Sequence, residues 1–250
     1  MIRYLNSFMR HWRLYRLFPG ECYGCFRGVY SSFEEALAAA PKTKKTGYDH
    51  HELAQWYLEE LDDEIKDFDY PVMFHLQKLL PLGPKVLDFG GNIGIHYLQY
   101  KKYVPFIEQS QWVVFELPEM VEAAQQKVNE PGLSFTADFE ADFEADIFLA
   151  SGSLQYIGDV KSLLQRFQSL PKHLLINRLP LYPGEQFVTL QNGGQVFYPQ
   201  YVFNETEFLQ GLNDLGYTLR DRWVDRIDGC IVPFHPKRSI AHYSGLYLSR

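Results

Sequence analysis

The chain has 250 residues, of which 46% are hydrophobic and 22% charged, a composition typical of a globular protein with one main α/β core. No apolar run approaches the roughly 20 residues that span a bilayer, so stable membrane insertion is not expected. The net charge of -7 argues against general nucleic-acid binding, because phosphate affinity depends on clustered Lys and Arg.

Cysteine usage favours a reducing, cytoplasmic location. Three cysteines, Cys22, Cys25 and Cys230, cannot all pair within one chain, so no disulfide framework is expected. Cys22 and Cys25 have the spacing of a metal or redox pair, but no second pair supplies the other ligands of a structural zinc. We therefore expect plain thiols and no metal site.

Residues 1–80 are expected to form a helical extension or lid. Segment 1–18 places four arginines among apolar residues, and it can either pack on the protein as an amphipathic helix, which we prefer, or lie on a membrane surface. Hydroxyl residues followed by two glutamates predict a short helix ending at Ala40. A longer helix is predicted by the helical spacing of Leu53, Trp56, Tyr57, Leu61 and Ile65.

From residue 81 to 250, strand and helix patterns alternate. Strands are predicted at 85–89, 112–116, 133–137, 145–150, 173–177, 219–225 and 244–249. Helices are predicted at 93–104, 119–128, 160–170 and 204–216. The alternation favours an α/β fold, with a mostly parallel seven-stranded sheet and helices on both faces.

The first predicted strand carries Asp88 into a glycine-rich turn, Phe89-Gly90-Gly91-Asn92-Ile93-Gly94. Glycine permits both a tight turn and a close approach of the backbone to a ligand. A nucleotide-like cofactor would lie on this turn, although a purely structural turn is the alternative.

Two acidic positions strengthen the nucleotide interpretation. Glu116 ends the next predicted strand, 28 residues after Asp88, where a carboxylate can accept both ribose hydroxyls of an adenosine. Asp138 and Phe139 follow the third predicted strand. The Asp138 carboxylate could hold the adenine amino group, and the Phe139 ring could lie on the adenine ring face. Asp142 is the alternative acid for this role. The alternative is that these acids are solvated loop residues.

These motifs, together with residues 145–156, resemble the class I S-adenosylmethionine-dependent methyltransferases over about residues 84–250. The whole chain is also similar to a bacterial group of methyltransferase-like proteins with mostly unassigned substrates. The family often has Leu-His after its fourth strand, where this sequence has Leu154-Gln155, so a histidine base at that position is not available.

The resemblance implies a Rossmann-like methyltransferase domain over residues 81–250, with S-adenosylmethionine as cofactor and S-adenosylhomocysteine as product. The implied cofactor-binding residues are Asp88, Phe89, Gly90, Gly91, Asn92, Gly94, Glu116, Leu117, Asp138, Phe139 and Ser151. The implied reaction is methylation of a small molecule or a sugar hydroxyl, O-methylation being favoured. A glycan acceptor and a homodimer are both compatible with this interpretation.

Tyr156 and Arg178 are the best candidates for contacts with the acceptor, because each follows a predicted parallel strand at the edge where open α/β proteins bind ligands. An arginine there could hold a carboxylate or phosphate, or fix a loop acid. A lone histidine is more often structural than catalytic. The residues considered as a general base are Tyr156 and the histidines His50, His51, His75, His96, His235 and His242. The aromatics considered as pocket walls are Tyr198, Tyr201 and Phe203.

Two other functional classes remain as alternatives. A nicotinamide-dependent oxidoreductase would share the sheet but would need Gly-x-Gly-x-x-Gly, from which Gly90-Gly91-Asn92-Ile93-Gly94 departs. A cofactor-binding scaffold without turnover is the other alternative, because a fold does not secure an activity.

Overall fold

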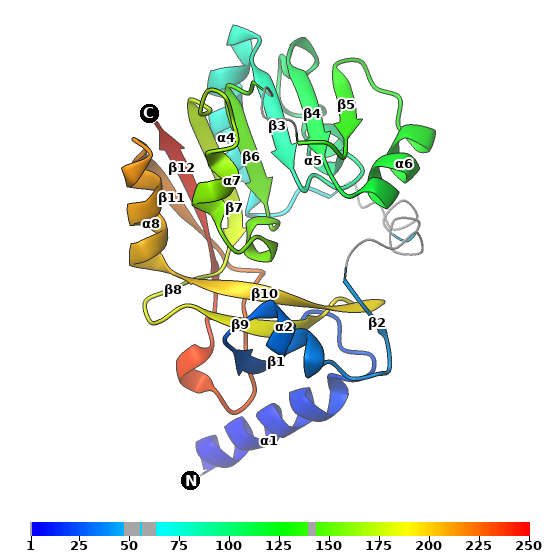
Figure 1. Cartoon of the computed structure of the whole chain (residues 1–250), viewed down its shortest axis with the longest axis vertical. Helices are drawn as coiled ribbons and strands as arrows, with labels where there is room; N and C mark the ends of the chain where they lie inside the picture. Colours follow the sequence, from blue (N-terminus) through cyan, green and yellow to red (C-terminus); the bar gives the residue numbers. More distant parts are fainter. Residues whose placement is uncertain (1, 48–55, 57–63, 140–143) are drawn as a thin grey trace.

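A computed structural model describes residues 2–47, 56, 64–139 and 144–250. Within these ranges a seven-stranded sheet has the strand order β11-β12-β7-β6-β3-β4-β5 (Figure 1). Its strands are β3 (Lys85–Phe89), β4 (Gln111–Phe115), β5 (Leu133–Thr136), β6 (Ile147–Ser151), β7 (His173–Leu179), β11 (Thr218–Asp225) and β12 (Tyr243–Ser249). All seven strands predicted from the sequence are confirmed, with ends displaced by at most two residues.

Five strands, β3 to β7, are mutually parallel, and β12 is antiparallel to both of its neighbours, β7 and β11. The chain runs outward from β3 to β4 and β5, then returns to β6 on the opposite side of β3. The strand order therefore reverses between β3 and β6, and open α/β sheets bind ligands outside the carboxyl ends of the strands at such a reversal.

Helices cover both faces of the sheet, as predicted, because successive strand residues point to opposite sides. On β3, Val86 packs in a core with Val72 and Tyr97, whereas Leu87 packs in a core with Leu164 and Leu212. The helices that supply these cores are α4 (Asp69–Leu79) and α5 (Ile95–Tyr100) on one face, and α7 (Val160–Leu164) and α8 (Glu205–Asp214) on the other. Helix α6 (Pro118–Lys127) covers the turn that follows β3. Short 3-10 turns are η1 (Leu80–Leu82), η2 (Ile107–Gln109), η3 (Leu154–Tyr156) and η4 (Pro236–Arg238).

A second sheet lies across the carboxyl ends of the central strands (Figure 1). It joins β1 (Cys25–Tyr30), β9 (Phe187–Asn192), β10 (Val196–Asn204) and β2 (Lys45–Thr46), and the short β8 (Leu181–Tyr182) also pairs with β10. Helix α1 (Ile2–Leu17) and helix α2 (Phe33–Ala38) pack beside it. Because η3 packs against β10, the second sheet and the carboxyl edge of the first sheet face each other.

The expectation that residues 1–80 are helical needs correction. Helices α1, α2 and α4 are present, but β1 and β2 belong to the second sheet, which they share with residues 187–204. The sequence analysis missed this sheet. The helix predicted around Leu53 and Leu61 lies mainly outside the described residues.

The prediction of free thiols is wrong for two of the three cysteines. Cys22 and Cys25 form a disulfide at the start of β1, while Cys230 is free and buried. A pair of cysteines three residues apart can therefore close a tight turn without belonging to a larger disulfide framework.

Candidate functional site

The turn after β3 is shaped by contacts that only glycine tolerates. Gly90 has a φ of +68°, and a Cβ at this residue would lie 2.4 Å from the Cβ of Ser153. A Cβ on Gly91 would lie 2.5 Å from the carboxyl of Asp88. Asn92 adopts a φ of +57°, a left-handed conformation that asparagine tolerates better than most residues. The turn therefore begins with two residues that carry no side chain, at the carboxyl end of β3.

Asp88 lies beneath this turn and has no exposed surface. Both of its carboxyl oxygens lie 3.0 Å from His96 Nδ1, and Trp112 Nε1 donates to Oδ2 at 3.3 Å. Asp88 therefore supports Gly91 from below.

His96 is buried against Asp88 and has a shifted pKa. Burial alone lowers the pKa of the imidazole, but the Asp88 carboxylate, its hydrogen bond and the nearby Asp69 outweigh burial and raise it. The His96–Asp88 pair thus holds the first turn of α5 against the end of β3.

Glu116 connects the glycine turn to the neighbouring strand. Its Oε1 accepts the Asn92 N–H at 3.0 Å, and its Oε2 accepts the Leu117 N–H at 2.9 Å. The side chain is half-buried, and Leu117 beside it is exposed. A carboxylate at the tip of β4 therefore borders the turn, as the sequence predicted.

The predicted adenine contacts have unequal surroundings. Asp138 is exposed, and its N–H donates to Thr136 Oγ1 at 3.1 Å. Phe139 is buried, with its ring edge-on to Phe167 at 5.0 Å, and the guanidinium of Arg166 lies 4.7 Å from the ring centre. Phe139 is thus part of the core beneath this edge. The competing candidate Asp142 lies outside the described residues.

The loop after β6 is fastened to the turn and to β7. Ser153 Oγ donates to the Phe89 carbonyl at 2.6 Å. Ser151, a predicted cofactor contact, is buried and accepts a hydrogen bond from Asn177 Nδ2 at 3.2 Å. Asn177 Oδ1 in turn accepts the Trp223 indole N–H at 2.9 Å. Neither Ser153 nor Asn177 was predicted as a site residue, although Asn177 ends one predicted parallel strand and Ser153 lies three residues after another.

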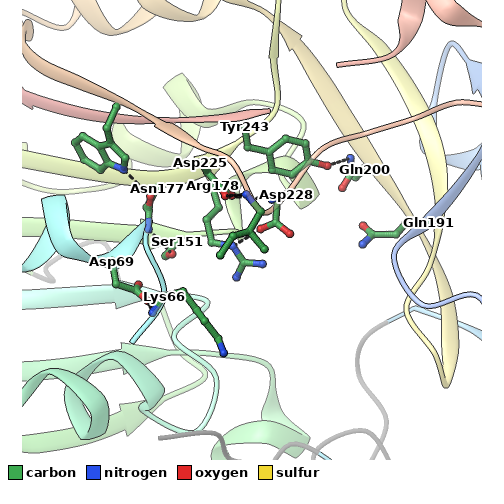
Figure 2. Close-up of polar contacts among 12 residues, drawn as sticks. Lys66, Asp69, Ser151, Asn177, Arg178, Gln191, Gln200, Asp225, Asp228 and Tyr243 are labelled. Carbon is green, nitrogen blue, oxygen red and sulfur yellow. Dashed lines mark hydrogen bonds and ion pairs between the residues drawn. The ribbon is translucent and has the colours of Figure 1, made fainter. Parts of the chain in front are cut away.

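Arg178 ends this row of polar residues, with a backbone φ of +55° (Figure 2). Its Nε donates to Asp228 Oδ2 at 2.6 Å, and the guanidinium lies 4.7 Å from the centre of the Phe68 ring. Burial disfavours the charge, but Asp228 and Asp225 outweigh burial and raise the pKa of Arg178. Of the two interpretations left open, fixing a loop acid is the contact observed.

The other two guanidinium nitrogens of Arg178 point away from Asp228 in Figure 2, toward the region bordered by Ser151 on one side and Gln191 on the other. A Cβ at Gly152 would lie 3.4 Å from Nη1. The glycine after β6 therefore leaves room for the guanidinium at the carboxyl edge of the sheet.

Asp225 and Asp228 form an acidic pair that the sequence analysis did not single out. Asp225 is fully buried, its Oδ1 accepts the N–H groups of Ile227 and Asp228, and its Oδ2 has no hydrogen-bond partner. Burial and the neighbouring Asp228 carboxylate raise the pKa of Asp225 to about 6. Two acids three residues apart, the first ending a predicted strand, were the available signal.

Tyr156 links η3 to the second sheet. Its hydroxyl donates to Gln191 Oε1 at 3.3 Å, and its ring is edge-on to Tyr198 at 5.4 Å. Beside it, Gln155 and Gln200 are buried with one unpaired side-chain oxygen each, and Gln200 Nε2 donates to the Tyr243 hydroxyl at 2.9 Å. The second sheet therefore contributes polar atoms opposite Arg178.

The remaining candidates are dispersed. Tyr201 stacks on Phe33 at 4.5 Å, and Phe203 is buried in the core. His75 is buried and bonded to Asp221 at 2.9 Å, and His235 and His242 are exposed. His50 and His51 lie outside the described residues.

The structure resembles solved methyltransferases. The match to the CcbJ methyltransferase from Streptomyces caelestis covers 79% of this chain and 95% of that chain, with 12% identity and a TM-score of 0.50. The match to human N-acetylserotonin methyltransferase, solved in complex with SAM, covers 88% of this chain and 62% of that chain, with 15% identity and a TM-score of 0.52. The chain has the Rossmann-like methyltransferase fold. No family model matches the sequence, and no curated protein matches it.

Within the described residues, two features are absent. Over the described ranges, no helix combines the length and apolar character needed to cross a membrane. The same ranges contain no group of three or more His, Cys, Asp or Glu side chains that could hold a metal ion.

A cleft of about 540 Å³ lies along α4, lined in part by Tyr70, Phe74 and Tyr103, and includes none of the site residues described above.

Proposed function

We propose that the chain is an S-adenosylmethionine-dependent methyltransferase. The observation that carries this proposal is the hydrogen bond from Asn92 N to Glu116 Oε1, which fastens a glycine-lined turn to a carboxylate at the tip of the adjacent strand. Both lie at the carboxyl edge of the sheet, where the strand order reverses. This arrangement suits a ligand with one charged end and a ribose.

The residues present fit such a cofactor. Internal packing requires glycine at 90 and 91, because a Cβ there would collide with Ser153 or Asp88. A backbone without side chains can approach a ligand closely. In this proposal the turn from Phe89 to Gly94 borders the methionine portion, Glu116 accepts the ribose hydroxyls, and Ser151 lies near the sulfonium. Leu117, Asp138 and Phe139 border the adenine, while Asp88 acts from beneath the turn.

When bound, S-adenosylmethionine supplies a methyl group already activated by its sulfonium, so the protein mainly has to hold the acceptor in line. Arg178 and Tyr156 are assigned to the acceptor side because they lie between the two sheets. Held at Nε by Asp228, Arg178 is oriented to donate hydrogen bonds from its other nitrogens. We expect a small molecule or sugar carrying a hydroxyl, with O-methylation favoured.

Calorimetric titration with S-adenosylmethionine and S-adenosylhomocysteine, with NAD and NADP for comparison, tests the cofactor assignment. We expect micromolar binding of the first two alone. Nicotinamide binding, or no binding of any of the four, would contradict the proposal. Tight binding without methyl transfer across an acceptor screen would instead favour a scaffold without turnover.

The Glu116 assignment has its own test. We expect Glu116→Ala to weaken S-adenosylmethionine binding 10-fold or more, by about 1.5 to 3 kcal/mol, because charge-assisted hydrogen bonds are lost. Glu122→Ala is the matched control, since Glu122 is an exposed acid on the following helix. Unchanged affinity in a folded Glu116→Ala protein would defeat the assignment.

A further inference from the structure

Among the described side chains of residues 9–18, the most buried lie on one face of helix α1 and its end. Phe18, directly after the helix, is fully buried, and Leu14 packs in the same core. Tyr15 accepts a hydrogen bond from Arg27 Nη2 at 2.8 Å, and the Arg27 guanidinium lies 4.3 Å from its ring centre. His11 Nδ1 accepts the Phe234 N–H at 3.3 Å. Packing of the N-terminal segment on the protein, which we preferred from the sequence, is confirmed.

The opposite face of α1 combines exposed apolar and basic side chains. Met9, Trp12 and Leu17 are 67%, 45% and 42% exposed. Arg10, Arg13 and Arg16 are exposed between them. With 100° of rotation per residue, these six positions fall on one side of the helix and the packed positions 11, 14, 15 and 18 on the other. Three arginines and three large apolar residues therefore share one solvent-facing surface.

The charge of this helix is opposite to that of the rest of the chain. Residues 2–17 include four arginines and no acid, so a total of -7 leaves -11 on the remaining residues. The partner of such a surface must attract guanidinium groups and also accept apolar side chains. An anionic bilayer provides both, because its phosphates attract arginine and its headgroup region accommodates Trp, Met and Leu. Nucleic acid would leave the apolar side chains without a partner.

We propose that the exposed face of α1 binds reversibly to the surface of anionic lipid membranes. Phe234, which is 40% exposed and lies 5.7 Å from the Trp12 ring centre, extends the apolar part of this surface. In Figure 1, α1 lies at the opposite end of the molecule from the amino ends of the central strands, beyond the second sheet. Membrane binding through α1 therefore leaves the seven-stranded sheet and its helices clear of the bilayer. This inference does not depend on the proposed methyl transfer.

Sedimentation of the full chain with lipid vesicles tests this proposal. We expect binding to vesicles of equal parts phosphatidylglycerol and phosphatidylcholine, little binding to phosphatidylcholine alone, and release when salt is raised from about 0.1 M to about 1 M. Arg13→Gln with Arg16→Gln should weaken binding about 25-fold, because each surface arginine contributes roughly 5-fold. Met9→Gln with Leu17→Gln should weaken it without changing its salt dependence.

The matched control is Lys127→Gln with Arg250→Gln, which removes the same charge from two exposed positions outside α1. We expect this protein to bind like the wild type, with circular dichroism verifying the fold of every variant. Failure of the wild type to bind, equal binding to both vesicle types, or equal losses in the control and the arginine variant would each overturn the proposal. So would a change of oligomeric state in the arginine variant with vesicle binding intact.

Discussion

Asp225 is a buried carboxyl whose ionisation opposes folding. Its pKa of about 6 lies above the value of about 3.9 expected in an unfolded chain, because burial and Asp228 disfavour the charge. The folded protein therefore holds more protons in this window, so stability falls as pH rises from about 4 to 6.

Asp225→Asn should remove this pH dependence. The amide keeps an oxygen for the N–H groups of Ile227 and Asp228 but loses the charge. We expect the variant to be more stable than the wild type by about 1 to 3 kcal/mol at pH 8, and equal to it near pH 4. Urea unfolding at both pH values measures this difference. Asp67→Asn, at an exposed aspartate, is the control, and an equal gain there would refute the argument.

The positions of candidate residues were easiest to predict where the pattern is local in sequence, while their roles toward a cofactor stay predictions. The turn from Gly90 to Gly94 and the acid Glu116 were identified because each directly follows a recognisable strand. Asp228, which fixes Arg178, was missed because its partner is 50 residues away and only the fold brings the two together. Asp88 was also named from the sequence. Its burial beneath Gly91 could not be predicted from the spacing of residues, because burial depends on how the chain packs around it.

At the scale of elements, Asn192 fastens the second sheet to the segment after α1. Fully buried at the end of β9, its Nδ2 donates to the carbonyls of Phe18 and Gly20 at 2.7 and 2.9 Å. Its Oδ1 accepts from Gly194 N at 2.9 Å and from Lys44 Nζ at 3.0 Å. One side chain therefore satisfies four partners from three segments.

We expect Asn192→Ala to destabilise the protein by about 2 to 4 kcal/mol, because several buried polar groups lose their partners at once. The midpoint of urea unfolding measures this loss. Asn213→Ala, at an exposed asparagine on α8, should change stability by less than about 0.5 kcal/mol. If the two variants lose similar stability, the hydrogen bonds of Asn192 do not fasten this sheet.

The elements of the two sheets differed in how well the sequence predicted them. Strands β3 to β7 alternate with helices in a regular pattern, and their parallel pairs join residues 21 to 61 positions apart, from Trp112 with Leu133 to Val86 with Ile147. The second sheet instead pairs β1 with β9, and Arg27 opposes Leu190. β9 and β10 form a hairpin across the Gly193-Gly194 turn, but β1 lies too far from them in the sequence for one local pattern to predict all three strands together.

For the whole molecule, binding of a ligand should raise the midpoint of thermal unfolding, Tm. A ligand that binds only the folded state at 100 times its Kd adds about 2.7 kcal/mol. For a protein of this size that corresponds to a Tm increase of roughly 5 to 10 °C. We expect this shift with S-adenosylhomocysteine and none with NAD at the same concentration. Differential scanning calorimetry measures both, and the reverse order would favour the oxidoreductase alternative.

The pairing of β1 with β9 also has a consequence for how the chain acquires its structure during synthesis. Beside the paired strands, Thr189 Oγ1 donates a hydrogen bond to the carbonyl of Gly28, which lies 161 residues earlier in the chain. At about 5 to 20 residues per second, a ribosome needs roughly 10 to 30 s to synthesise that interval. For all of this time the nascent β1 lacks its partner strand β9. The rate of translation therefore sets how long the unpaired edge of β1 stays open to chaperones or to other nascent chains.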